Sequence, residues 1–419
     1  MNDLDTDDVD GLVALLPQVV QEVVLETVRD THTAVANRVF GLVPGSEGPR
    51  MVHDRIVGML YAVVGSGVRG THLLARTWSR FTAGTRDPKA LNRNAVWRRT
   101  VAIINGVLGD VLAEQGNPLA LSMTIRVDND DVAVDATALR DAFPEATPRV
   151  AVLLHGLVEN DESWTFKPDV NPRTYAELLN SAGVTPVVLR YNSGRHISAT
   201  AADLDRLLED LVDQWPVPLT ELILIGHSMG ALVIRGAGEF GRIGGRRWPR
   251  LASHVVMLGA PHGGAALEKA ANAGAWLLAA VPEMAPFSRV LRRRSAGIKD
   301  LRHGYLNEED WFDADPDAWR SRPGRQVDPL DRAAHHLVGA TLGAGTSGPL
   351  SGSLGDLLVR WGSATAAGRD WARGATVTHI GSANHFALLN HPEVAGLLLR
   401  IVQGQAGSVP GRDRGLTPP

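Results

Sequence analysis

The sequence of 419 residues contains no cysteine. A disulfide framework, catalysis by a thiol and cysteine-ligated metal centres are therefore excluded. Neither sign of charge is in large excess, since the formal net charge is only −4. Such a chain has no electrostatic field that would gather a polyanion, so we do not expect it to bind nucleic acid. It also lacks a phosphate-cradling glycine motif and a metal-ligand spacing of His and Asp, so we predict no cofactor and no metal.

A long apolar run is missing as well. The longest uncharged apolar stretch near the amino terminus, residues 56–68, is interrupted by glycines and is shorter than the ~20 residues that a membrane span needs. The first ten residues, MNDLDTDDVD, are acidic where a secretion signal is basic, and no cleavable apolar core comes after them. Together with the absence of cysteine, these features predict a soluble protein of the cytoplasm.

Helical periodicity dominates the first part of the chain. Apolar residues recur at helical spacing from about residue 9 to 40, and two further helical segments are expected at about 51–81 and 94–114. Because no strand pattern interrupts them, we predict a helical extension over residues 1–120 that packs on the rest of the protein. A helix lying on a membrane surface is the alternative, but it needs a basic polar face, and the polar face of the first helix is mixed to acidic.

From residue 121 the pattern changes to strands. Alternation over 122–127, a polar turn at 128–131 and renewed apolar residues at 132–134 predict a hairpin. Short apolar runs then alternate with helical stretches such as 201–214 and 231–240. These runs predict an α/β fold in which a mostly parallel sheet is covered by helices on both faces and the hairpin forms one edge. The runs are Val150–Leu154, Thr185–Leu189, Leu222–Ile225, Val255–Leu258, Ala334–Leu342 and Thr376–Ile380.

The run 222–225 is followed directly by Gly226-His227-Ser228-Met229-Gly230 and then by a helical stretch. This is a G-x-S-x-G pattern at the carboxyl end of a strand, where parallel sheets carry their functional groups. Two glycines permit a tight strand-to-helix reversal that lifts the Ser228 hydroxyl above the sheet. The dipole of the following helix favours negative charge close by. A serine that merely caps a helix is the alternative for an isolated pattern of this kind.

A nucleophilic serine needs a base, a carboxylate that orients the base, and donors for the oxyanion. In folds with this serine turn the chain order is serine, acid, histidine. His385 lies after the last predicted strand, 376–380, and we predict that it is the base. His379 lies within that strand, and His391 precedes a proline at a helix start, so neither is favoured.

The acid should leave the strand before the last one. Asp356 comes after a glycine in a loop, and we predict that it orients the base. Asp328 and Asp331 are alternatives, but they lie before the predicted strand 334–342 rather than after it. A helix cap is the other role that Asp356 could have.

The loop after the run 150–154 begins with His155-Gly156. In this type of fold such a loop supplies one oxyanion donor, and the residue after the nucleophile supplies the other. We therefore predict the backbone N–H groups of Leu157 and Met229 as the donors. His155 is expected to fix the loop rather than to act as a base, and with Gly156 it is expected to border the substrate.

These segments resemble those of α/β-hydrolase lipases and esterases, in the broad group that includes bacterial triacylglycerol lipases. The likeness covers about residues 120–403, and its specificity lies in several segments that occur in the expected order. In that family the corresponding residues form a catalytic triad, which the resemblance carries onto Ser228, Asp356 and His385. Glycine and serine are more loosely spaced in 350–358 than in the family pattern, and this departure concerns the acid. The matching segments are His155-Gly156, Gly226–Gly230, Leu258–Ala265, Gly355–Val359 and Asn384–Pro392.

An insertion at about 265–330 is rich in alanine and leucine near its start and contains Trp276. Insertions at this place commonly cap the nucleophile, and an apolar cap favours an acyl chain, so we predict that Trp276 contacts the substrate. Packing of Trp276 on the body of the domain is the alternative. The hydrolase domain is expected over 121–403, with a disordered tail over 404–419.

The predicted function is hydrolysis of a small-molecule or lipid carboxylic ester, with a transient contact to a membrane or lipid surface left open. An amidase, a thioesterase or a polyester depolymerase would use the same residues. A non-catalytic binding protein is disfavoured because it needs neither the triad nor the oxyanion donors. The sequence does not determine the oligomeric state.

Overall fold

A computed structural model describes residues 95–117, 119–165, 171, 173–264, 295–311, 327–346, 355–356 and 358–405. The chain divides into two compact units, one of residues 1–101 and 270–294, the other of residues 102–269 and 295–419. Only residues 95–101 of the first unit are described, and the sheet and its covering helices belong to the second unit. The other predicted amino-terminal helices, most of the insertion with Trp276, and nearly all of the tail lie outside the described residues.

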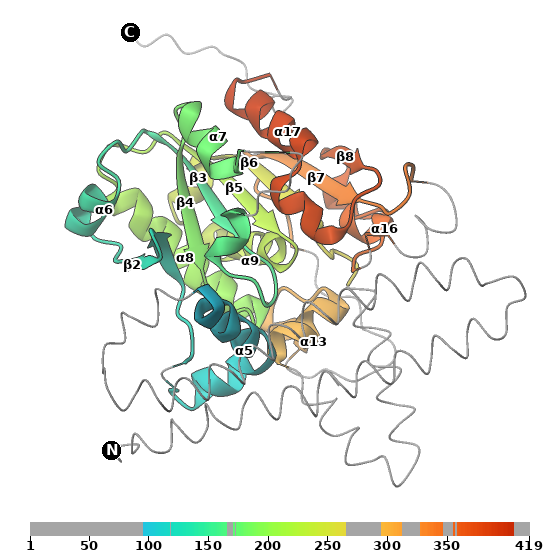
Figure 1. The fold of residues 1–419 in the computed structure, drawn as a ribbon, viewed down its shortest axis with the longest axis horizontal. Coiled ribbons are helices and arrows are strands. Elements are labelled where there is room, and N and C mark those ends of the chain that lie inside the picture. The colour runs from blue at the N-terminus through green and yellow to red at the C-terminus, as the bar shows by residue number, and fades with distance from the viewer. Residues whose placement is uncertain are drawn as a thin grey trace, which may run out of the picture. The chain divides into compact units, whose positions relative to one another are not determined.

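The described strands form one eight-stranded sheet in the order β2-β1-β4-β3-β5-β6-β7-β8 (Figure 1). β1 pairs antiparallel with β2 and with β4, and the strands from β4 to β8 pair parallel. The predicted parallel sheet with a hairpin at one edge is therefore confirmed. The strands are β1 (Thr124–Val127), β2 (Asp130–Val132), β3 (Arg149–Leu154), β4 (Thr185–Arg190), β5 (Glu221–His227), β6 (Ala252–Leu258), β7 (Ala334–Ala340) and β8 (Thr376–Ile380).

The hairpin turn is tighter than the sequence indicated. Asp128 and Asn129 alone connect the two strands, with φ of 51° and 69°. Positive φ at both central residues is the geometry that matches the twist of a two-residue hairpin, and Asp and Asn tolerate it. Asp130 and Asp131 therefore belong to β2, which ends at Val132, and the predicted strand 132–134 begins two residues too late.

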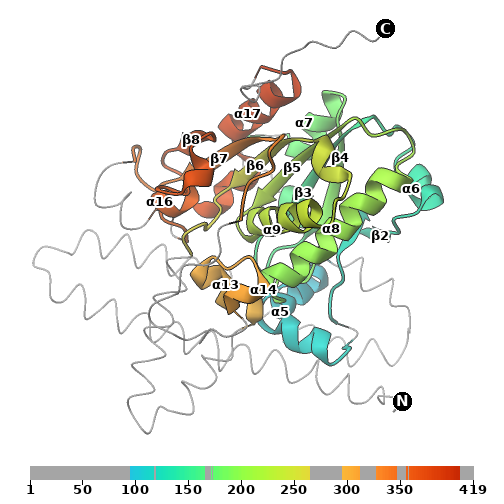
Figure 2. The ribbon, with the colours of Figure 1, turned by 180° about the vertical axis from the view of Figure 1, so that it is seen from behind.

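Helices cover both faces of the sheet. α8 and α9 lie over one face, as Figure 2 shows, and α7 and α17 over the other. The predicted helices 94–114, 201–214 and 231–240 correspond to α5, α8 and α9. The larger helices are α5 (Ala95–Glu114), α6 (Ala136–Ala142), α7 (Tyr175–Ser181), α8 (Ile197–Gln214), α9 (Met229–Ile243), α13 (Ala296–His303) and α17 (Pro392–Val402), and the shorter ones are η2 (Asp161–Thr165), α10 (Trp248–Leu251), α14 (Glu308–Trp311), α16 (Trp361–Ala364), η4 (Asp370–Ala372) and η5 (His385–Asn390).

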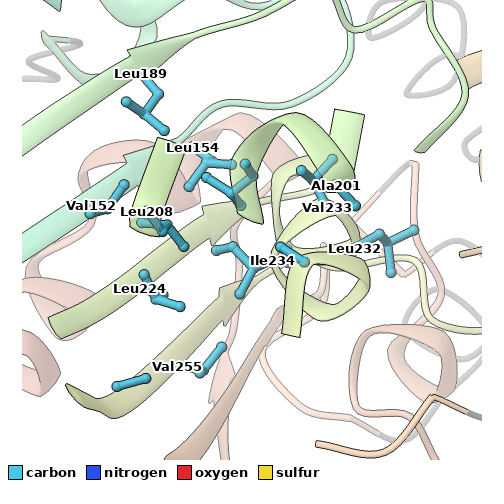
Figure 3. Close-up of a cluster of buried hydrophobic side chains, with 14 of the residues drawn as sticks. Val152, Leu154, Leu189, Ala201, Leu208, Leu224, Leu232, Val233, Ile234 and Val255 are labelled. Atoms are coloured by element: carbon cyan, nitrogen blue, oxygen red, sulfur yellow. The ribbon is translucent and has the colours of Figure 1, made fainter. Parts of the chain in front are cut away.

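Each central strand divides its side chains between two buried clusters. Leu222 and Leu224 of β5 pack with α8 and α9, whereas Ile223 and Ile225 pack with the side that carries α7 and α17. Figure 3 shows the first cluster, in which Leu224 gathers with side chains of α8 and α9. Strands that are apolar on both faces explain why the sequence shows continuous apolar runs instead of alternation. Within the described part of the chain, no helix is long and apolar enough to cross a bilayer.

Candidate active site

Ser228 occupies the reversal between β5 and α9. Its backbone has φ 51° and ψ −117°, a combination that costs a non-glycine residue about 1–3 kcal/mol. Its N–H donates to Leu258 O at 2.7 Å, which ties the reversal to the end of β6. Ser228 is partly exposed, whereas His227 and Met229 on either side of it are buried. The strained turn thus exposes one hydroxyl at the carboxyl edge of the sheet.

The two glycines of the pattern are required by close backbone contacts. A Cβ on Gly226 would lie 2.4 Å from the nitrogen of Ala231, within the same reversal. A Cβ on Gly230 would lie 2.5 Å from the carbonyl oxygens of both Leu154 and His155. The first turn of α9 therefore rests directly on the end of β3. This contact brings the N–H of the residue after the serine close to the loop that leaves β3.

Asp356 and His385 form a buried pair. Asp356 lies after β7 and is fully buried, and its Oδ2 lies 2.7 Å from Nδ1 of His385, which is 2 % exposed. Oδ1 of Asp356 accepts the N–H groups of Leu358 and Val359 at 3.0 and 2.7 Å. Burial opposes protonation of His385, but the charge and hydrogen bond of Asp356 outweigh it and raise the pKa of the imidazole above its ordinary value.

The His385 ring lies beside the serine turn. Gly259 comes directly after Leu258, the residue that accepts the Ser228 N–H, and has a φ of 62°. A Cβ on Gly259 would lie 2.9 Å from Cε1 of His385, so the glycine leaves room for that ring. The rings of His227 and His385 have centroids 4.7 Å apart. The Asp356–His385 pair, far from the serine turn in the sequence, therefore lies next to the residues that flank this turn.

The loop after β3 is held in a strained conformation. The β-branched Val158 has a φ of 58°, which is unfavourable for such a residue. Its N–H donates to Ser193 Oγ at 3.1 Å, and the N–H of Gly156 donates to Glu159 Oε2 at 2.7 Å. The Leu157 N–H thus lies between two anchored amides. This anchoring gives the predicted oxyanion donor a fixed backbone.

A sequence model of the alpha/beta hydrolase family matches residues 151–396, more than half of the chain. The chain belongs to this family. No curated protein matches the sequence. Among solved structures, the chain is similar to the mature lipase BlEst2 of Bacillus licheniformis, with 17 % identity, 62 % of this chain and 93 % of that one covered, and a TM-score of 0.40.

Two further solved structures are similar to this chain. An esterase of Pyrococcus furiosus has 13 % identity over 62 % of this chain and 83 % of its own, with a TM-score of 0.37. The RedJ thioesterase of Streptomyces coelicolor has 17 % identity over 62 % of this chain and 91 % of its own, with a TM-score of 0.34. At these identities the likeness concerns the fold alone and decides nothing about the substrate of this alpha/beta hydrolase.

The alternative bases and acids lie elsewhere in the hydrolase fold. His379 is held within β8, with Nε2 2.8 Å from Thr341 Oγ1, and His391 caps α17 by accepting the Glu393 N–H. Asp328 and Asp331 lie before β7 and act electrostatically on Arg242 in the last turn of α9. That turn is about 20 Å along the helix from the serine, given 1.5 Å per residue. Neither aspartate shares an edge of the sheet with Ser228.

His155 has the framework role that its position suggested. Its ring is fully buried and stacks on Tyr191 with centroids 4.3 Å apart. Nε2 accepts the Tyr191 N–H at 3.3 Å, so the ring proton is on Nδ1, which lies 2.8 Å from Gly156 O. Burial lowers the pKa of His155, in keeping with a neutral ring. The side chain therefore has no surface for the substrate contact that we predicted for it.

The Gly259–Gly264 turn is fastened to α9 by Arg235. Nη1 of Arg235 lies 3.3 Å from Nδ1 of His262, Nη2 donates to Val327 O at 3.1 Å, and the guanidinium stacks over Trp371 at 4.0 Å. These contacts account for the burial of His262, which is 1 % exposed. Within the described residues, no group of three or more His, Asp or Glu side chains could hold a metal ion.

Proposed function

We propose that this alpha/beta hydrolase cleaves carboxylic esters through an acyl-enzyme intermediate on Ser228. The observation that carries the proposal is the fully buried Asp356 carboxylate at 2.7 Å from His385 Nδ1, beside the strained serine turn. A carboxylate held there commits Nδ1 of His385 to a hydrogen bond and leaves Nε2 to take the serine proton. A helix cap would need no histidine at that distance.

The proposed reaction uses each of these positions. The Ser228 Oγ attacks the ester carbonyl carbon while its proton passes to His385 Nε2. The negative charge that develops on the carbonyl oxygen is stabilised by the N–H groups of Leu157 and Met229, each of which contributes about 2.7–4 kcal/mol in comparable sites. His385 then protonates the departing alkoxide, and an alcohol leaves. Water, deprotonated by His385, cleaves the acyl-enzyme to release the acid and restore Ser228.

The first test is the variant Ser228→Ala. It removes the nucleophile with little change in volume, so ester hydrolysis should fall to background while circular dichroism and the melting temperature stay as in the wild type. A fluorophosphonate should label the wild type at Ser228 and should not label the variant. Retention of more than a few per cent of the activity by Ser228→Ala would refute the proposal.

The second test separates ester cleavage from related chemistry on the same residues. Wild-type protein is assayed on p-nitrophenyl esters of increasing chain length and on the matching anilides and thioesters. We expect the esters to be cleaved fastest. If the anilides or thioesters were preferred at equal chain length, the protein would be an amidase or a thioesterase, and the ester proposal would be wrong.

A further inference from the structure

Glu159 and His227 connect three parts of the proposed active site. Oε2 of Glu159 accepts the Gly156 N–H at 2.7 Å, and Nδ1 of His227 lies 2.9 Å from Oε1 and 3.0 Å from Oε2. On the other side of the ring, Nε2 of His227 lies 3.2 Å from the carbonyl oxygen of His385. A Cβ on Gly156 would lie 3.1 Å from the Glu159 carboxyl group, so the loop closes tightly on it.

The partners of His227 fix the orientation of its ring. A peptide carbonyl can only accept a hydrogen bond, so Nε2 donates to His385 O. Nδ1 lies within hydrogen-bond distance of both carboxylate oxygens of Glu159. The ring is therefore held from both sides.

The hydrogen bonds of this pair are shielded from solvent. His227 is fully buried and Glu159 is 9 % exposed. Burial alone would raise the pKa of Glu159, but the charge of His227, its hydrogen bond and that of the Gly156 N–H lower it below the ordinary value. Removing one member of a buried hydrogen-bonded pair is costly because the other member is then left without its partner. The pair is therefore a rigid connection.

We propose that Glu159 and His227 are positioning residues that hold the oxyanion loop and the backbone of His385 in register with Ser228. Glu159 anchors the amide that precedes Leu157, and His227 is the residue before the nucleophile, so this hydrogen-bonded pair couples the donor, the nucleophile and the base. The pair lies behind the reacting atoms and binds no substrate itself. This proposal rests on the function proposed above, because it assigns the pair to the same serine site.

The decisive variant is Glu159→Gln. Its amide oxygen can keep the Gly156 N–H at the Oε2 position, but an NH₂ group then replaces Oε1, 2.9 Å from Nδ1 of His227, and the carboxylate charge is lost. Displacement of reacting groups by ~1 Å costs on the order of 100-fold in rate. We expect kcat to fall about 10- to 100-fold with KM within about twofold, because only transition-state stabilisation is lost. Glu159→Asp keeps the charge and should recover part of kcat.

The readout must separate positioning from folding. Wild type, Glu159→Gln, Glu159→Asp and His227→Gln are compared for kcat, KM, melting temperature and affinity for phenylboronic acid, which forms a tetrahedral adduct with an active serine. Glu162→Gln is the matched control, since Glu162 lies three residues further along in η2, is half-buried, and is not among the groups that bond to Gly156 N–H or His227. Its kinetics should equal those of the wild type.

The outcomes distinguish the two proposals. Loss of kcat in parallel with loss of boronate affinity, at unchanged KM and with partial recovery in Glu159→Asp, supports the positioning role. Because the pair acts as a unit, the double variant Glu159→Gln/His227→Gln should lose about as much kcat as the more severe single variant. Wild-type kcat in Glu159→Gln, or a lower melting temperature with unchanged boronate affinity, overturns it. If Ser228→Ala stays active, the hydrolase proposal itself fails, which is a different result.

Discussion

Asp356→Asn tests the proposed triad most sharply, because the structure dictates how the new side chain must lie. Oδ1 of Asp356 accepts two backbone N–H groups, from Leu358 and Val359. An asparagine keeps both bonds only if its oxygen takes that position. Its NH₂ group then points at Nδ1 of His385, where the wild type has a carboxylate oxygen at 2.7 Å. The mutation therefore converts an acceptor for Nδ1–H into a donor.

The consequence for the base comes from the chemistry of imidazole. With a donor facing Nδ1, the neutral ring carries its proton on Nε2 and cannot accept the proton of Ser228. The same wrong tautomer lowers kcat about 10⁴-fold in serine proteases, which corresponds to about 5.5 kcal/mol in the barrier. Substrate contacts are untouched, so KM should change little. The two retained backbone bonds should keep the loss of folding stability to about 1–3 kcal/mol.

The assay measures kcat and KM on a p-nitrophenyl ester, with melting curves to confirm that the variant is folded. Asp328→Asn and Asp331→Asn are the matched controls, since both aspartates are exposed and lie before β7. These two variants should retain wild-type turnover. A value of kcat for Asp356→Asn within tenfold of the wild type, or an inactive Asp328→Asn or Asp331→Asn, would show that the acid is assigned wrongly.

Three further predictions concern pH and the glycine contacts. His385 must be neutral to act as the base, and Asp356 raises its pKa above the ordinary 6.5. We therefore expect kcat/KM to increase with pH through a midpoint above 6.5. A midpoint below 6.5 would contradict the proposed pairing of Asp356 with His385. Gly230→Ala should abolish ester hydrolysis and lower the free energy of unfolding by about 1–3 kcal/mol, because the new Cβ would lie 2.5 Å from two carbonyl oxygens. In Gly362→Ala the new Cβ would lie 3.8 Å from its nearest neighbour, so kinetic and melting measurements on this control should match those of the wild type. Burial lowers the pKa of His336 to about 4, so between pH 6.5 and 4 the unfolded chain binds a proton that the folded chain does not, and stability should fall as the pH falls. Denaturant titrations measure how the free energy of unfolding changes with pH, and His336→Gln should reduce that dependence by about 1.4 kcal/mol per pH unit between pH 6.5 and 4. An unchanged pH dependence would exclude His336 as its source.

The sequence alone determined the elements that depend on local pattern. Apolar runs such as 222–225 predicted buried strands because both faces of a parallel sheet are covered, and all of the predicted runs are strands of the sheet. The serine turn could also be predicted from the sequence, because two glycines at fixed spacing after a strand are a local pattern. A Cβ at either glycine would lie 2.4 or 2.5 Å from backbone atoms, which is why only glycine fits there. Among the described residues, the extent of the hairpin turn and the end of the predicted strand 334–342, which stops at Ala340, differed.

The tertiary structure decided the pairings between distant residues. Asp356 was favoured over Asp328 and Asp331 only by its place after a predicted strand, and the structure shows that its carboxylate lies against His385. Glu159 and His227 had no signal of their own, because their roles depend on hydrogen bonds that span 68 and 158 residues of sequence. Likewise, His155 was expected to border the substrate, but stacking on Tyr191 buries its ring. The distant partner of a polar side chain is a property of the packed state, and local periodicity carries no information about it.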